Sequence, residues 1–112
     1  SEYGARAALI STYLHEETTW RSYYNGGCYF VDADHYPHVK VISRYLDIEG
    51  HPAAIIEIPI KKGKAILSGV HFETGTSHQP SDLEDHMLQT LAPYEAQRKR
   101  FFDHLLCRLI DK

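Results

Sequence analysis

A histidine and a glutamate two residues apart are the plainest candidates for chemistry in this sequence. They are His71 and Glu73, and they follow an apolar run at residues 65–67 and a glycine, Gly69. Side chains at a spacing of two project from the same face of an extended backbone, so the two would stand side by side if the strand continues past Gly69. A carboxylate next to an imidazole can fix its tautomer, as the orienting acid does in nucleophile–histidine–acid triads. We interpret the pair as a general base and its orienting acid, with a surface hydrogen bond as the alternative.

A second candidate site is the aromatic and glycine-rich run at residues 23–30. Glycines let backbone amides approach a ligand closely, and tyrosines can form the walls of such a site. The residues that would bind a ligand here are Tyr24, Asn25, Gly26 and Gly27; a structural turn is the alternative. Cys28 is expected to be buried between aromatic neighbours and to be structural rather than nucleophilic.

Composition excludes several classes of function. A chain of 112 residues with 43% hydrophobic residues is sufficient for one compact domain. A formal net charge of -3 predicts neither a nucleic-acid partner nor an anionic membrane surface. No apolar run reaches the roughly 20 residues that cross a bilayer, and the first residues do not resemble a signal peptide, so we expect a cytoplasmic protein. The eight histidines show no HExxH-like spacing, and we expect no metal and no cofactor.

Strand patterns dominate the first two-thirds of the chain. Residues 53–60 and 64–67 are apolar and are joined by so short a connection that an antiparallel hairpin is favoured over a parallel crossover. Apolar, aromatic and β-branched residues predict four further strands, at residues 5–10, 20–24, 29–31 and 39–45.

The last third changes to a helical period. Ser81 and Glu84 match a capping box that would open a short helix. A longer helix is expected from about Pro93 to Ile110, with residues 97–100 forming solvated surface and Cys107 acting as a small core residue. Its apolar stripe consists of Tyr94, Phe101, Phe102, Leu105, Leu106, Leu109 and Ile110. The whole pattern predicts an α/β fold in which a mixed sheet is covered on one face by the C-terminal helix.

Three motifs together resemble a known family. They are Tyr-Asn-Gly-Gly-Cys-Tyr-Phe-Val-Asp-Ala at residues 24–33, Pro-Ala-Ala at 52–54 and Gly-Lys-Ala-Ile-Leu-Ser-Gly-Val-His-Phe-Glu at 63–73. With residues 1–7, they resemble the biotin-protein ligase N-terminal domain family, which is similar in fold to the class I glutamine amidotransferases. The resemblance implies that residues 1–112 form a single domain or the C-terminal half of such a flavodoxin-like domain. It also implies that His71 and Glu73 take the places of the triad histidine and acid.

The cysteine nucleophile of that family lies upstream of every motif found here. Family members also carry prolines where this chain has Val70 and Phe72. We therefore expect the isolated chain to be an inactive, amidotransferase-like binding or interaction module. The alternative is part of a cysteine-dependent amidotransferase or hydrolase whose nucleophile lies upstream or on a partner chain. A half-domain would leave apolar sheet surface uncovered, so the expected partners are a second copy of the chain or the missing N-terminal half, together with a small-molecule ligand.

Overall fold

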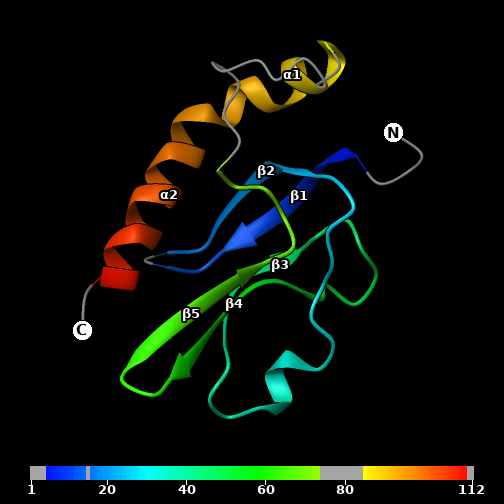
Figure 1. Ribbon diagram of the computed structural model, residues 1–112. Helices are drawn as coiled ribbons and strands as arrows, with labels where there is room; N and C mark the ends of the chain where they lie inside the picture. The colour runs from blue at the N-terminus through cyan, green and yellow to red at the C-terminus, as the bar shows by residue number, and fades with distance from the viewer. Residues whose placement is uncertain (1–4, 15, 74–84, 111–112) are drawn as a thin grey trace.

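The computed structural model describes residues 5–14, 16–73 and 85–110, which form a five-stranded sheet and two helices (Figure 1). Two short 3₁₀ segments, η1 and η2, interrupt the connections. The elements in chain order are β1 (Arg6–Thr12), β2 (Thr18–Tyr24), η1 (Ala33–His35), β3 (Lys40–Tyr45), β4 (Ala53–Ile60), β5 (Gly63–Ser68), α1 (Asp85–Leu91), η2 (Ala92–Tyr94) and α2 (Glu95–Ile110).

The α/β class and the C-terminal helix on the sheet are confirmed. The strand order is β2-β1-β3-β4-β5, and each of the four described pairings is antiparallel, so the expectation of a mixed sheet was wrong in that respect. For the three pairs that are consecutive in the chain, β1–β2, β3–β4 and β4–β5, the reason lies in the short connections, since a parallel neighbour needs a crossover of a dozen or more residues. The predicted hairpin of β4 and β5 is present, with Ile60 opposite Gly63.

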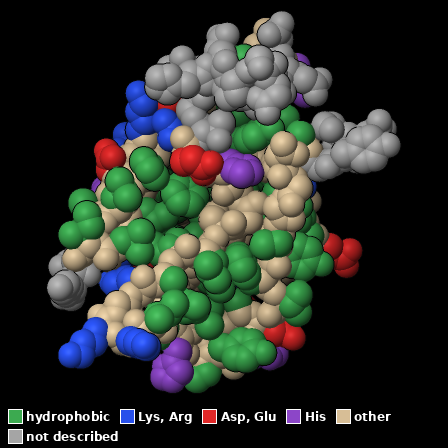
Figure 2. Space-filling model, viewed as in Figure 1, with side chains coloured by type: hydrophobic (Ala, Val, Ile, Leu, Met, Phe, Trp, Pro, Cys, Tyr) green, Lys and Arg blue, Asp and Glu red, His purple; other side chains and the backbone are tan. Residues whose placement is uncertain are grey.

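Helix α2 covers one face of the sheet through a narrow line of side chains. Phe101 and Leu105 are buried, and the Phe101 ring lies 5.3 Å from that of Trp20. The rest of the predicted stripe is less buried: Leu106, Leu109 and Ile110 are exposed, and so is Cys107, which is therefore not a core residue. A helix that rests on a curled sheet contacts it along one row of positions four residues apart, which leaves the neighbouring row in solvent. Figure 2 shows hydrophobic side chains gathered over the C-terminal half of α2 and over β5.

The sheet curls until the chain beyond one edge strand reaches the other edge strand. β2 and β5 lie at opposite ends of the strand order. After β5 the chain crosses over, and the amide of His71 donates a hydrogen bond of 2.7 Å to the carbonyl of Tyr23 at the end of β2. Tyr23 also packs against Met87 and Leu91 of α1. The predicted capping box at residues 81–84 lies outside the described residues.

The predicted strand at residues 29–31 is absent. Phe30 makes one isolated bridge to Ala53, while Tyr29 and Val31 are exposed. Asp32 adopts a left-handed backbone with φ of 55°, which ends the extended run and turns the chain into η1.

Candidate functional site

His71 and Glu73 do lie side by side, but in a turn rather than in a continuing strand. β5 ends at Ser68, and Phe72 and Glu73 form a turn. The Nδ1 atom of His71 is 3.1 Å from Oε2 of Glu73, and the two side chains are 46% and 55% exposed. An ionised carboxylate can only accept a hydrogen bond, so this contact places a proton on Nδ1 and leaves Nε2 as the imidazole atom that can meet a ligand. The catalytic role of the pair stays a prediction.

Two glycines in backbone contact bring this turn to the end of β2. A Cβ atom added at Gly27 would lie 1.9 Å from the carbonyl oxygen of Gly69. A Cβ atom added at Gly69 would lie 1.8 Å from the carbonyl oxygen of Cys28 and 2.5 Å from the hydroxyl of Tyr45. No side chain fits in either place, which is the physical reason for glycine at both positions. The turn at residues 25–27 therefore borders the segment that carries His71.

The predicted ligand-binding residues have structural partners of their own. The guanidinium of Arg6 lies 4.3 Å from the ring centre of Tyr24, and the Tyr24 hydroxyl donates to the carbonyl of Gly27 at 3.1 Å. Gly26 has φ of 66°, so glycine suits the bend, and Asn25 is exposed beside it. These contacts are those of a structural turn, and binding of a ligand by the four residues stays a prediction.

Cys28 is exposed, so the expectation of burial was wrong. The chain leaves the sheet after Gly27, and Tyr29 is itself 50% exposed and does not cover the thiol. The backbone carbonyl of Cys28, rather than its thiol, points inward and accepts a hydrogen bond of 2.6 Å from the Tyr45 hydroxyl. Burial first, then the neighbouring Tyr24 and Cys28, raise the pKa of the Tyr45 phenol well above its ordinary value of 10.0.

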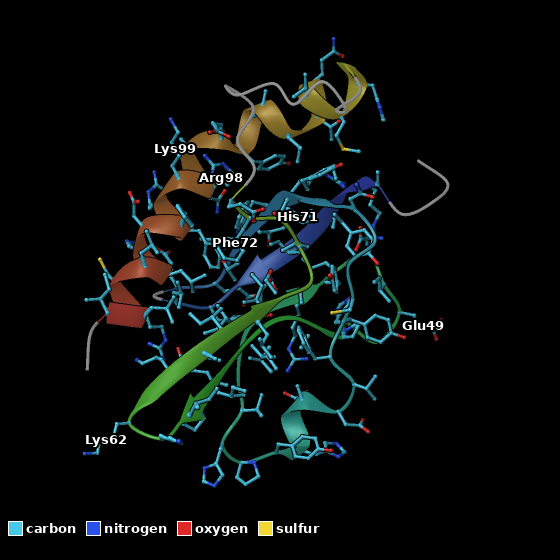
Figure 3. The ribbon with its side chains drawn as sticks, viewed as in Figure 1. Glu49, Lys62, His71, Phe72, Arg98 and Lys99 are labelled. Atoms are coloured by element: carbon cyan, nitrogen blue, oxygen red, sulfur yellow. The ribbon has the colours of Figure 1, made fainter. Side chains whose placement is uncertain are left out.

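Arg98 lies beside the turn at Phe72 and Glu73, although its charged neighbours in the sequence predicted solvated helix surface. Arg98 is only 13% exposed, and its Nη1 donates to the carbonyls of Phe72 at 3.2 Å and Glu73 at 3.3 Å. Figure 3 shows it directed from α2 toward the segment of His71, whereas Lys99 points away. A signal was present in the sequence, because Glu95 and Arg98 stand three residues apart, as helical ion pairs do.

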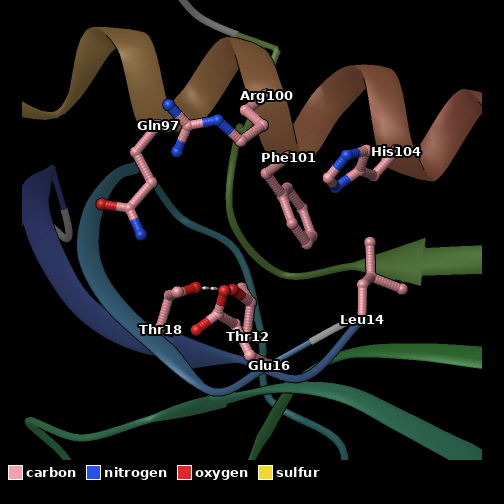
Figure 4. A pocket seen from close by; sticks show the side chains of 8 residues that line it. All are labelled: Thr12, Leu14, Glu16, Thr18, Gln97, Arg100, Phe101 and His104. Carbon is pink, nitrogen blue, oxygen red and sulfur yellow. Dashed lines mark hydrogen bonds between the residues drawn. The ribbon is translucent and has the colours of Figure 1, made fainter.

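Two hollows lie elsewhere on the described part of the molecule. One, of about 90 Å³, lies between the β1–β2 hairpin and α2 (Figure 4); its walls are Thr12, Leu14, Glu16, Thr18, Gln97, Arg100, Phe101 and His104. The other, of about 340 Å³, is formed by residues 29–35, Arg44 and residues 49–53. Neither contains His71 or Glu73.

Residues 5–14, 16–73 and 85–110 contain neither a metal-binding cluster nor a membrane-spanning helix. No cluster of three or more His, Cys, Asp and Glu side chains there could hold a metal ion. Neither helix there is long and apolar enough to cross a membrane.

Comparison with known proteins identifies the family. The family model described as "Biotin-protein ligase, N terminal" matches residues 1–110. A biotin–protein ligase of Schizosaccharomyces pombe is 36% identical over 87 residues, which are 71% of this chain and 13% of that protein. An uncharacterized protein of Chlamydia muridarum is 48% identical over 50 residues, which are 45% of this chain and 19% of that protein. The chain thus spans a small part of these relatives, and no solved structure matches it significantly. The chain belongs to the biotin-protein ligase N-terminal family.

Proposed function

We propose that this chain supplies the histidine and the acid of a thiol-dependent site of the amidotransferase type, and that it is not catalytic by itself. The carrying observation is the contact between Nδ1 of His71 and Glu73, at 3.1 Å. With the proton held on Nδ1, the lone pair of Nε2 can accept a proton from a nucleophile. His71 is the base in this proposal and Glu73 the orienting acid.

The nucleophile of this proposal comes from another part of the same polypeptide. Among the described contacts, the His71 side chain hydrogen-bonds to Glu73 and to no thiol. A half-exposed imidazole leaves room for an incoming group. The matches to this chain cover only 13% and 19% of the length of its two relatives. Together with family membership, this supports a contribution from residues outside this chain.

The test compares thiol alkylation by iodoacetamide in two samples. One is the isolated chain, and the other is the longer polypeptide that this proposal requires, called the whole polypeptide below. In the whole polypeptide we expect one thiol that reacts fast near neutral pH and slows at least tenfold in His71→Gln, because a paired imidazole increases thiolate character. Glu73→Gln should slow the same thiol by a smaller factor. His35→Gln is the matched control, since His35 is an exposed histidine on η1.

Three results would contradict the proposal. One is a whole polypeptide in which no thiol responds to His71→Gln. Another is an isolated chain in which alkylation of Cys28 slows in His71→Gln, because that would make Cys28 the partner of the imidazole. Glutamine hydrolysis by the isolated chain would likewise show that the site is already complete.

The uncovered apolar surface favours an interaction role as a second candidate. Leu67 of β5 and Leu106, Leu109 and Ile110 of α2 are 43%, 41%, 40% and 76% exposed. Side chains of this kind tend to be covered by association, and β5 is an edge strand among the described elements. The occupant in this proposal is a second copy of the chain, which would form a homodimer.

Light scattering at rising concentration tests the dimer. We expect the isolated chain to be dimeric and Leu109→Lys to be monomeric with an unchanged circular dichroism spectrum. A monomer at all concentrations would exclude a second copy as the occupant of this surface.

A further inference from the structure

The acid–base pair has few means of holding itself in place. His71 and Glu73 are about half exposed and lie in a turn beyond the last strand. An exposed pair of this kind contributes little stability, because water competes for both groups. The backbone of His71 is fixed by its hydrogen bond to Tyr23. Among the described residues, the backbone of Glu73 has no strand partner, so the contacts that hold it come from elsewhere.

The guanidinium of Arg98 is the group that fixes it. One nitrogen, Nη1, donates to the carbonyl oxygens of Phe72 at 3.2 Å and of Glu73 at 3.3 Å. The other two nitrogens, Nε and Nη2, donate to the carboxylate of Glu95 at 3.0 and 2.7 Å. Arg98 and Glu95 are only 13% and 19% exposed, so both side chains are largely shielded from water. The two hydrogen bonds to one carboxylate fix the orientation of the guanidinium.

The side chain between the two site residues is anchored to the same helix. The ring of Phe72 lies 5.6 Å from that of Phe101, edge to face, and 5.8 Å from that of Phe102. Helix α2 therefore holds the Phe72–Glu73 segment by its ring and by its two carbonyls. Figure 3 shows Arg98 and Phe72 converging between α2 and the turn.

We infer that Arg98 is a positioning residue, which holds the Phe72–Glu73 backbone so that the Glu73 carboxylate stays on Nδ1 of His71. Its use in catalysis rests on the function proposed above, whereas its effect on the imidazole can be measured without any reaction. When Arg98 is removed, the turn relaxes and the carboxylate leaves Nδ1. The imidazole proton is then free to move to Nε2, and an Nε2 that carries a proton cannot accept one from a nucleophile.

The test is NMR of the imidazole nitrogens of His71 in the full chain at about pH 9, where a histidine with an ordinary pKa near 6.5 is neutral. The variant is Arg98→Gln together with Glu95→Gln, which replaces both charged groups of the clamp by neutral amides of similar size. A second variant, Arg98→Lys, keeps the charge but lacks the planar fork that reaches both carbonyls and Glu95. Lys99→Gln is the matched control, because Lys99 is exposed on the same helix.

In the parent chain and in Lys99→Gln we expect the proton on Nδ1. In both Arg98 variants we expect the proton to shift predominantly to Nε2, as in the reference variant Glu73→Ala, which has no acceptor for Nδ1, while the melting curve of Arg98→Lys stays within a few degrees of the parent. An unchanged tautomer in both Arg98 variants would overturn the inference. A shifted tautomer with no His71-dependent thiol in the whole polypeptide would confirm the clamp and refute the proposed function, so the two can fail separately.

Discussion

Replacement of Gly69 by alanine is the most direct test of how the structure brings the site together. Gly69 lies between β5 and His71, and its backbone touches the carbonyl of Cys28 and the hydroxyl of Tyr45. The residue has no left-handed backbone, so alanine meets no conformational strain of its own at this position. The whole effect must therefore come from the space that the added methyl group requires.

The size of the effect follows from two distances. The new Cβ would lie 1.8 Å from the Cys28 oxygen and 2.5 Å from the Tyr45 hydroxyl, so the two backbones must separate by about 1.5 Å to reach ordinary contact. Overpacking of this kind costs about 1–3 kcal/mol. The separation also breaks the partly buried hydrogen bond from Tyr45 to Cys28, at about 1–3 kcal/mol for the groups left unpaired. We expect a loss of about 4 kcal/mol in the free energy of unfolding.

Urea denaturation followed by circular dichroism measures this loss. With a slope of about 2 kcal/mol per molar urea, the midpoint of Gly69→Ala should fall by about 2 M. Gly63→Ala is the control, because the nearest atom to its Cβ is an ordinary 3.8 Å away, and its midpoint should stay within about 0.3 M of the parent. Gly26→Ala should lie between them, at about 1–2 kcal/mol, since its cost comes only from the left-handed backbone. Equal midpoints for Gly69→Ala and Gly63→Ala would refute the close contact.

Three further results are expected. Arg108→Gln should lower the free energy of unfolding by about 1–3 kcal/mol in urea, because it leaves the carboxylate of Glu57, 13% exposed, without its partner; an unchanged midpoint would contradict this. Cys28 and Cys107 should both react with a thiol reagent in the native chain without denaturant, and protection of either would contradict its exposure. Stability should fall as pH rises above about 10, because the folded chain keeps the Tyr45 proton that the unfolded chain loses; the slope approaches about 1.4 kcal/mol per pH unit, and Tyr45→Phe should flatten it in alkaline urea titrations.

Most helices and strands could be predicted from the sequence, because the pattern of apolar residues within each segment is sufficient to indicate its type. β4 spans Ala53–Ile60 as the apolar run indicated, and its short connection to β5 sufficed to predict an antiparallel hairpin. Helix α2 ends at Ile110, as the helical period indicated, and Pro93 falls in η2 immediately before it. The helical period of apolar residues could not predict which side chains of α2 would be buried, since that depends on how the sheet curls against the helix.

The site was harder to predict than the elements, because contacts between distant residues build it. A spacing of two correctly suggested that His71 and Glu73 would meet, although the turn that joins them is not a strand. The exposure of Cys28 depends on where the chain leaves β2, and aromatic neighbours in sequence do not report it. The role of Arg98 depends on a turn 25 and 26 residues away in the sequence.

The construction of the site explains why a pair this exposed can still be well defined. Tyr23 fixes the backbone of His71, the Gly27–Gly69 contact fixes the approach of the chain, and Arg98 fixes the carbonyls of Phe72 and Glu73. All three constraints act on the backbone, and the contact with Glu73 orients the half-exposed imidazole. In the function proposed above, a group from another part of the protein docks on this exposed imidazole, and its docking would exclude water and strengthen the His71–Glu73 contact.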